Sequence, residues 1–352
     1  MTSGSADPAT SAPIRTAIVG YGLAGSVFHA PLISADPAYA LRGIVTGDRE
    51  RARAATERYP GVRVLPSVEH LLATDEYDLV VIASPTPSHV ELAERTLELG
   101  LATVVDKPLA VRSADAERLI ALADSRGAAL TVFQNRRWDG DFLTVQRLVE
   151  EGTLGEVRRF ESRFEWLNPR PRPAWKSGTT GRDGGGIAYD LGSHLIDQAV
   201  RLFGPVEEVY GELDRRGANA VNDDDSFIAL THTSGVRSHL GMSSLVARRG
   251  FRFRVLGSAS AYTKWGLDPQ ESQLAAGMSP LDEGFGVERA ESYGRLGRDE
   301  DDRPVPTERG GYRRFYAMLA EALAGRGPLP VDPRDALTAI RVVETLQAQQ
   351  GG

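Results

Sequence analysis

The chain has 352 residues, 41% of them hydrophobic and 25% charged, and its 41 basic and 48 acidic side chains leave a net charge of −7. This mildly acidic balance excludes the basic surface typical of proteins that bind nucleic acids or anionic membranes. The absence of cysteine excludes disulfides and thiolate chemistry, and no apolar run reaches the roughly 20 residues of a membrane span. We therefore expect about two globular domains with a sizeable core and neither a nucleic-acid nor a membrane partner.

A glycine-rich turn follows the first predicted strand. Residues 1–13 are small and polar and are predicted to be a disordered lead-in to a cytoplasmic protein. An apolar strand over residues 17–19 leads into Gly20-x-Gly22-x-x-Gly25 and then into a predicted helix over residues 23–33. In such motifs the first glycine permits the tight turn, the second lets backbone N–H groups approach a pyrophosphate, and the third allows close packing of helix on strand.

The turn therefore predicts a dinucleotide site, and its expected contacts are Gly20, Gly22, Leu23, Ala24 and Gly25. The alternative is a structural turn that holds no ligand.

The end of the second predicted strand, residues 39–46, bears on the choice of cofactor. Thr46 stands where an acidic residue commonly binds the ribose 2′-hydroxyl, and Arg49 follows shortly after it. A hydroxyl side chain beside arginines suits a 2′-phosphate, so the sequence favours NADP(H), with NAD(H) still possible. The alternative is that these arginines form only the solvated face of a helix predicted over residues 48–59.

Strands and helices alternate through the first half of the chain. Strands are predicted over residues 79–83, 102–105 and 130–133, and helices over residues 88–99 and 113–126. Such alternation indicates a parallel sheet with right-handed crossovers, as in a Rossmann domain.

Polar motifs follow two of these strands. Ser84-Pro85 and the nearby His89 follow the first, and Asp106-Lys107 follows the second. The carboxyl ends of parallel strands are where open α/β sheets bind ligands, so all five residues are candidates for cofactor contacts. Ser88, with Glu91 three residues later, is predicted to cap the helix that begins there.

The second half predicts a different architecture. Strands expected over residues 157–167, 206–213, 227–233, 236–245 and 251–256 follow one another with turns between them, which favours an open, mostly antiparallel sheet. The acidic stretch at residues 291–309 is predicted to be a loop. No spacing of His, Asp and Glu resembles a metal site, and we predict none.

An Asp–His pair lies between the first two of these strands. The stretch 183–203 has apolar residues at helical spacing, and Asp190 and His194 stand four apart on one face, so their side chains can meet. A carboxylate can fix the tautomer of a histidine and stabilise its charged form, which suits a general base. The alternative is a helix-capping aspartate and a histidine with a structural role.

Four motifs in order carry a family resemblance: the glycine motif at residues 20–25, Ser84-Pro85-x-Pro87-x-His89, Asp106-Lys107-Pro108, and the residues QNRRW at 134–138. Together they resemble the Gfo/Idh/MocA family of NAD(P)-dependent oxidoreductases over almost the whole chain after residue 13. Asp106 replaces the glutamate usual in the family, and Thr46 replaces its common ribose-binding acid.

The resemblance implies an α/β plus α+β fold. Its first part is a Rossmann parallel sheet over residues 14–133. A domain for substrate binding and oligomer contacts follows over residues 134–352, built on the open sheet, and its last helix packs back on the first domain. The implied assembly is a homodimer or homotetramer formed through that sheet.

The resemblance also implies an activity, in which hydride passes between a nicotinamide and a secondary alcohol or ketone of a sugar or cyclitol. The local sequence is most similar to the branch with NADP-dependent scyllo-inositol dehydrogenase, so an inositol-like polyol is the expected substrate. Lys107, His194 and Asp190 are the implied catalytic residues, and the sequence leaves open whether Lys107 or His194 is the acid–base. Two alternatives are a non-catalytic NAD(P)-sensing regulator and an S-adenosylmethionine methyltransferase.

Overall fold

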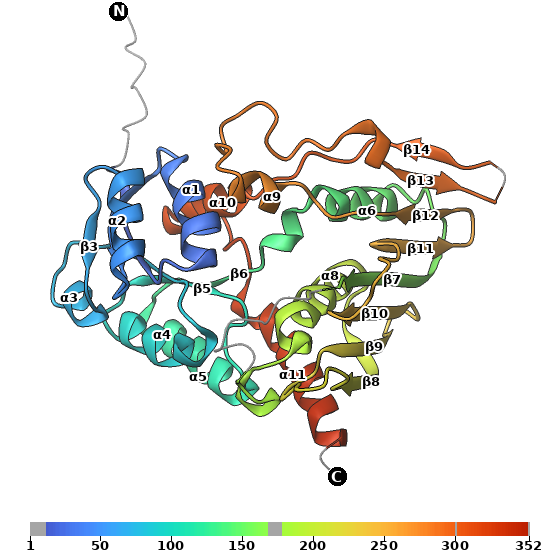
Figure 1. Cartoon of the computed structure of the whole chain (residues 1–352), viewed down its shortest axis with the longest axis horizontal. Helices are drawn as coiled ribbons and strands as arrows, with labels where there is room; N and C mark the ends of the chain where they lie inside the picture. Colours follow the sequence, from blue (N-terminus) through green and yellow to red (C-terminus); the bar gives the residue numbers. More distant parts are fainter. Residues whose placement is uncertain (1–11, 168–177, 300, 351–352) are drawn as a thin grey trace, which may run out of the picture.

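The polypeptide builds two sheets that differ in strand direction (Figure 1). The structure, a computed structural model, describes residues 12–167, 178–299 and 301–350. The first sheet has six strands, all parallel, in the order β3-β2-β1-β4-β5-β6. Its strands are β1 (Ile14–Val19), β2 (Tyr39–Val45), β3 (Arg63–Leu65), β4 (Leu79–Ile82), β5 (Ala102–Asp106) and β6 (Leu130–Phe133).

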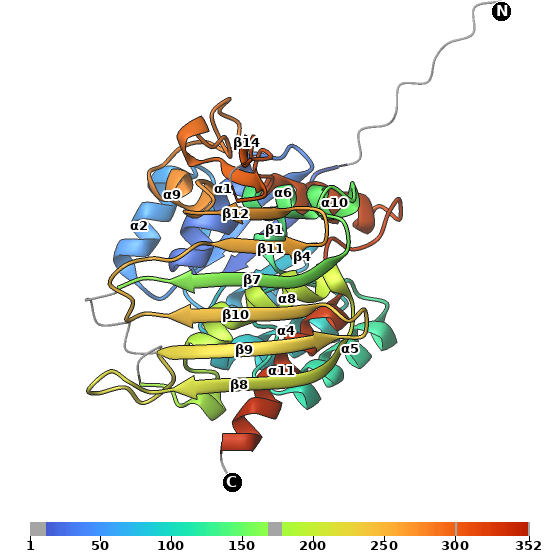
Figure 2. The same ribbon diagram turned by 90° about the vertical axis from the view of Figure 1, so that its right-hand side faces the viewer.

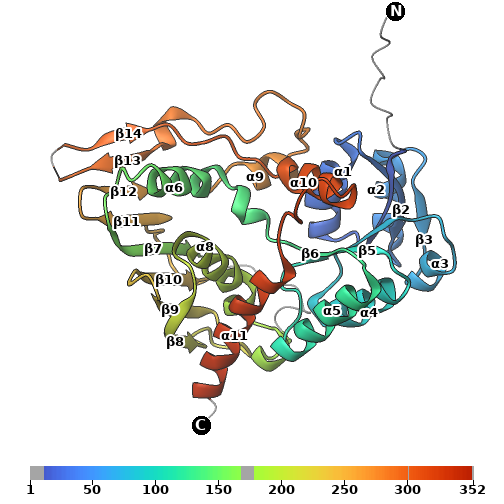
Figure 3. The same cartoon turned by 180° about the vertical axis from the view of Figure 1, so that it is seen from behind.

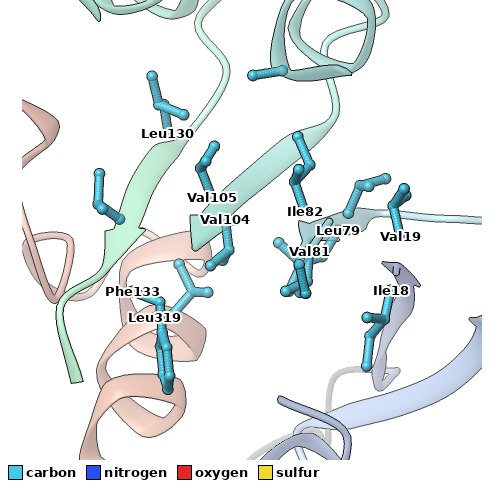
Figure 4. Packing of buried hydrophobic residues seen from close by; sticks show 14 of the residues in the cluster. Ile18, Val19, Leu79, Val81, Ile82, Val104, Val105, Leu130, Phe133 and Leu319 are labelled. Atoms are coloured by element: carbon cyan, nitrogen blue, oxygen red, sulfur yellow. The ribbon is translucent and has the colours of Figure 1, made fainter. Parts of the chain in front are cut away.

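This strand order confirms the predicted Rossmann sheet. The order reverses between β1 and β4, and in open α/β sheets ligands bind in the crevice at such a reversal, outside the carboxyl ends of the strands. The strands are nearly all apolar because helices cover both faces. Figure 4 shows Ile18, Val81 and Val104 from neighbouring strands packed together in this core.

The four predicted helices of the first half are present, with two differences in detail, and the short segments α3 and η2 are additional. The helical segments are η1 (Ala24–His29), α1 (Ala30–Ser34), α2 (Arg49–Arg58), α3 (Val68–Leu72), η2 (Thr86–Ser88), α4 (His89–Glu98) and α5 (Ser113–Arg126). The predicted first helix begins as a π-helix, η1, before it continues as α1. Ser88 stands at the N-cap position of α4 as predicted, but its side chain does not cap the helix, because its hydroxyl donates to the Pro85 carbonyl at 2.8 Å.

The second sheet confirms the predicted open, mostly antiparallel arrangement. Among the described residues, eight strands lie in the order β14-β13-β12-β11-β7-β10-β9-β8, in which β7 and β10 pair in parallel and the other neighbours are antiparallel. They are β7 (Val157–Glu165), β8 (Val206–Asp214), β9 (Asp225–His232), β10 (Arg237–Ser243), β11 (Phe253–Gly257), β12 (Ala261–Lys264), β13 (Gly294–Gly297) and β14 (Arg303–Val305).

The prediction of a loop over residues 291–309 is wrong, because β13 and β14 form a hairpin there. These strands are short and contain Gly294, Gly297 and Pro304, which have low β-propensity. Pairing holds them in place instead: β13 pairs with β12, and the Arg295 side chain donates to the Asp302 carboxylate across the hairpin.

Helices cover one face of this sheet. Figures 2 and 3 show the strands on one side and α6, α8 and α11 on the other, and among the described residues no helix lies on the opposite face. The helical segments of this half are η3 (Asn135–Trp138), α6 (Gly140–Glu150), η4 (Gly181–Asp183), η5 (Ala188–Gly192), α8 (Ser193–Phe203), α9 (Gln270–Ala275), η6 (Ala290–Ser292), α10 (Arg313–Leu323) and α11 (Pro333–Gln350).

The last helix, α11, belongs to both hydrophobic cores. Ala336 and Ile340 are buried in the core of the parallel sheet, whereas Val343 and Leu346 are buried in the core beneath the second sheet. The helix contacts α5 on one side and α8 on the other. Its burial therefore fixes the two sheets relative to each other, and with them the space between β5 and α8.

Candidate active site

In the glycine motif, the fold requires glycine at positions 20 and 25, whereas position 22 has space for a side chain. Gly20 has φ +99°, and a Cβ there would lie 2.6 Å from the carbonyl oxygen of Ala83. A Cβ on Gly25 would lie 2.1 Å from the Gly20 carbonyl oxygen. At Gly22 the nearest atom to a Cβ is Nη1 of Arg51, at 3.8 Å. The open backbone at Gly22 fits the approach of a pyrophosphate, which is the reason that dinucleotide motifs place glycine there.

The arginine that lies near the glycine turn is Arg51, and not Arg49, which the sequence analysis named. Asp48 caps α2, because its carboxylate accepts from the backbone N–H groups of Glu50 and Arg51 at 3.0 Å each, and these bonds lower the pKa of Asp48. Thr46 accepts from the Asp48 amide at 3.3 Å. Arg49 and Arg51 are both exposed, but it is Arg51, third in the helix, whose Nη1 lies near Gly22.

A pocket lies at the carboxyl ends of β4 and β5, and η5, the segment before the helix that carries His194, contributes to its lining. The predicted residues that line it are Ser84, His89, Asp106, Lys107 and Asp190. From the second half, Tyr189 and the glycines at 184–186 also contribute. The other predicted contacts lie outside this lining, at the glycine turn and the end of β2, and are Gly20, Gly22, Leu23, Ala24, Gly25, Thr46, Arg49 and Pro85.

His89 joins the two loops of the first domain that line the pocket. It is buried, and its Nδ1 lies 2.8 Å from the carbonyl oxygen of Pro108 while its Nε2 lies 2.9 Å from that of Ser84. The Lys107–Pro108 peptide bond is cis. The imidazole thus fixes the backbone on both sides of the pocket, and its ring nitrogens face protein carbonyls.

Lys107 is held by Asp190 from the other side of the pocket. Its Nζ donates to the backbone oxygen of Asp190 at 2.6 Å and to the carboxylate Oδ1 at 2.8 Å. The exposed fractions of the two side chains are 16% for the lysine and 28% for the aspartate. A partly exposed ammonium, already paired on one side, is suited to donate a further hydrogen bond to an oxygen in the pocket.

His194 does not belong to the lining of the pocket; it is buried, and the charges of Lys107 and Asp190 act on its imidazole. The residue is only 5% exposed. Burial, followed by the positive charges of Lys107 and Arg136, lowers the pKa of His194 well below its usual value near 6.5, while Asp190 acts in the opposite direction. Its Nδ1 has no hydrogen-bond partner among the described residues. The imidazole is therefore neutral near neutral pH and able to accept a proton.

The predicted contact between Asp190 and His194 is replaced by the contact between Asp190 and Lys107. Among the described residues, no hydrogen bond joins Asp190 to His194, although the charge of the carboxylate acts on the imidazole. The physical reason is the π-helix η5, which carries Asp190 and ends just before α8. A π-turn has i→i+5 hydrogen bonds, so positions four apart no longer stack as they do in an α-helix.

A buried polar network that the sequence analysis missed lies under α8. Arg252 is 2% exposed, donates to the Gln198 side chain at 2.8 Å and lies 4.0 Å from the ring centroid of Phe164. Gln198 also donates to the Arg136 carbonyl. The signal was present, because Gln198 is one helical turn after His194 on the buried face of an amphipathic helix.

Two further features bear on function. Within residues 12–167, 178–299 and 301–350, no group of three or more His, Asp or Glu side chains is arranged to hold a metal ion. Over the same described ranges, no helix is long and apolar enough to cross a membrane.

The fold and the pocket define a Rossmann dinucleotide-binding protein with a second domain built on a sheet. Residues 14–134 match the model of the oxidoreductase family with an NAD-binding Rossmann fold, and residues 142–263 match the GFO/IDH/MocA C-terminal domain. The chain therefore belongs to the Gfo/Idh/MocA family of oxidoreductases.

Similar proteins extend over almost the whole chain. The uncharacterized oxidoreductase YdgJ of Escherichia coli K12 is 39% identical over 337 residues, 94% of each chain. The scyllo-inositol 2-dehydrogenase (NADP(+)) IolW of Bacillus subtilis is 32% identical, over 94% of this chain and 92% of its own. The solved structure of yvaA from Bacillus subtilis superposes with a TM-score of 0.89 at 31% identity and covers 96% of each chain.

Proposed function

We propose that the chain is an NAD(P)-dependent dehydrogenase acting on a secondary alcohol of a sugar or cyclitol, or on the matching ketone. The observation that carries this proposal is the Lys107–Asp190 pair in the pocket at the carboxyl end of β5, whose charges act on the neutral His194. An ammonium and an uncharged imidazole provide a hydrogen-bond donor and a proton acceptor for one alcohol oxygen.

The proposed roles follow from the charge state of each group. When bound, the nicotinamide would accept the hydride in alcohol oxidation or donate it in ketone reduction. Lys107 donates a hydrogen bond to the substrate oxygen and stabilises negative charge as it develops there. His194 takes the hydroxyl proton during oxidation and returns it during reduction, so we assign it as the acid–base. Asp190 orients Lys107.

For the cofactor we propose NADP(H), with NAD(H) as the weaker ligand. The residues that would hold the dinucleotide are the open glycine turn at Gly22, the loops at Ser84 and Lys107, and the end of β2. There Arg51 would bind the 2′-phosphate, and Thr46 replaces the acid that would repel it. The NADP(+) named for the IolW dehydrogenase at 32% identity supports the same choice.

The substrate that we propose is an inositol-like polyol. Two relatives support the class: IolW is named a scyllo-inositol dehydrogenase, and a protein of Paraburkholderia graminis that is 32% identical over 195 residues is named a D-apiose dehydrogenase. The test is a panel of inositols, inososes, aldoses and ketoses assayed with NADP(H) and NAD(H). Turnover of an inositol or inosose supports the proposal, and turnover of only another sugar rejects inositol but keeps the enzyme class.

Tight cofactor binding without any turnover across the panel would instead indicate the non-catalytic NAD(P)-sensing regulator. The methyltransferase alternative has no support from the family matches.

We also propose that the protein acts in the cytoplasm as a homodimer or homotetramer formed through the second sheet. The support is the face of the sheet on which, among the described residues, Figure 2 shows no helix. The alternating burial along β9 and β10 places Phe227 and His239 on this face, where their ring centroids are 5.9 Å apart. Light scattering on the wild type and on Phe227→Glu tests this assembly. A monomeric wild type, or a variant with unchanged mass, would contradict it.

A further inference from the structure

Asp223 accepts hydrogen bonds from the backbone amides at the start of η5, the segment that carries Asp190. It lies in the turn before β9 and is 6% exposed. Its Oδ2 accepts from the Ala188 amide at 2.8 Å and from the Ser226 hydroxyl at 2.9 Å. Its backbone carbonyl accepts from the Ile187 amide at 3.1 Å. A single buried residue thus binds two consecutive amides at the start of η5.

Gly186 gives a second, independent indication of the same contact. It has φ +98°, and a Cβ at this position would lie 1.7 Å from Oδ1 of Asp223. The absence of a side chain at 186 is therefore what allows the carboxylate to reach the helix start. Gly186 also lines the pocket together with Lys107.

We propose that Asp223 is a positioning residue, which anchors η5 to the second sheet and thereby places Asp190 against Lys107. The path of contacts runs from β9 through Asp223 to Ala188, two residues along to Asp190, and across the pocket to the end of β5. Lys107 donates to both the carbonyl and the carboxylate of Asp190, so a shift in the start of η5 moves both acceptors at once.

The kinetic consequence rests on the proposed dehydrogenase activity, whereas the anchoring of η5 does not. Misplacing a catalytic group by about 1 Å can reduce a rate about 10²-fold. We therefore expect the loss of the Asp223 carboxylate to reduce kcat, and cofactor affinity to be spared because the glycine turn is on the other domain.

The neighbouring aspartate offers a matched control. The Asp224 carboxylate accepts from the Arg216 amide at 2.8 Å and from the Gly217 amide at 2.9 Å. Both donors belong to the turn between β8 and β9, so the Asp224 side chain supports that turn instead of η5.

The experiment compares the full-length wild type with Asp223→Ala, Asp223→Asn and Asp224→Ala. Asp223→Ala is expected to lower kcat about 10²-fold with the cofactor KM within about twofold. Asp223→Asn keeps an oxygen acceptor for the Ala188 amide and should recover to within about fivefold of the wild type. Amide hydrogen exchange over residues 187–192 should accelerate in Asp223→Ala and stay unchanged in Asp224→Ala.

Wild-type kcat and unchanged exchange in Asp223→Ala, or an equal loss in Asp224→Ala, would overturn the proposal. If the wild type turns over no substrate, the dehydrogenase proposal fails and exchange alone decides whether Asp223 anchors η5. If Asp223→Ala does not fold, Ser226→Ala replaces it, since it removes one donor to the same oxygen. An about fivefold lower kcat with faster exchange in that variant supports the proposal, and no change in either overturns it.

Discussion

Lys107 and Asp190 are 83 residues apart in the chain, and their side chains meet at 2.8 Å between the lysine Nζ and the carboxylate Oδ1. The lysine directly follows strand β5 of the Rossmann sheet, and the aspartate lies in η5 of the second half of the chain. This pair joins the two domains at the pocket and fixes the position of the lysine, whose charge acts on the buried His194.

Substitution of His194 tests its role as the acid–base. His194→Asn should lower kcat by about 10²- to 10⁴-fold while cofactor binding, measured by fluorescence titration, is retained. Because burial and nearby positive charges lower the pKa of His194, the wild-type oxidation rate should fall with acid only below about pH 6.5. A pH profile that begins to fall well above that value, or a variant with near wild-type turnover, would argue against this assignment.

The two arginines at the start of α2 provide a paired test of cofactor choice. Arg51→Ala should weaken NADPH binding about tenfold, because the guanidinium would pair with the 2′-phosphate, and should weaken NADH binding less, because NADH lacks that phosphate. Arg49→Ala is a matched change at the first position of α2, where the side chain is exposed as that of Arg51 is, but the nearest atom to a Cβ at Gly22 belongs to Arg51. Arg49→Ala should leave both affinities within about twofold. A larger effect at Arg49 than at Arg51 would restore the interpretation made from sequence alone.

The glycine motif predicts two different kinds of defect. Gly25→Ala places a Cβ 2.1 Å from the Gly20 carbonyl oxygen and should lower the unfolding free energy by more than about 2 kcal/mol. Gly22→Ala meets only Arg51 at 3.8 Å, so it should fold with near wild-type stability but bind cofactor weakly. Denaturant unfolding and cofactor titration distinguish the two, and equal unfolding midpoints for both variants would contradict this division.

The buried His29 contributes to the dependence of stability on pH. Burial lowers its pKa to about 4, from a usual value of 6.5, so in this range the unfolded state binds the extra proton and stability falls as pH falls. His29→Phe should therefore reduce the loss of unfolding free energy between about pH 7 and pH 5 by about 2 kcal/mol. The pKa of Asp268 is raised to about 6, which makes stability rise as pH falls. This contribution is the same in the wild type and in His29→Phe, so it cancels when the two are compared.

The matched control for this prediction is His70→Phe, the same substitution at an exposed position. An unchanged pH dependence in His29→Phe would show that the buried imidazole titrates normally.

Much of the first domain follows from its sequence. Continuous apolar strands, such as the one from Leu79 to Ile82, and glycines in fixed positions leave few alternatives for βα units. The hairpin at β13 and β14 does not follow, because Gly294 and Pro304 carry no local strand signal and the pairing depends on contacts distant in sequence.

In the site, too, the features set by the local sequence could be predicted, and those set by contacts distant in sequence could not. Lys107 and His194 stand out by residue type and position, and in the structure the charge of Lys107 acts on the His194 imidazole, although only Lys107 lines the pocket. The partner of Asp190 could not be predicted, because a single π-helical turn changes which residues share a face. In the sequence, Asp223 is one of several acids in a polar turn. Only the folded chain shows that its carboxylate accepts a hydrogen bond from the first amide of η5.

The most direct test of the account is the substrate panel run with the wild type and Lys107→Met side by side. We predict that the wild type transfers hydride between NADP(H) and at least one polyol or ketone. The variant should bind the cofactor with similar affinity but lose about 10²- to 10⁴-fold in kcat. Near wild-type turnover by Lys107→Met, or cofactor binding without turnover in the wild type, would contradict the proposed role of this pocket.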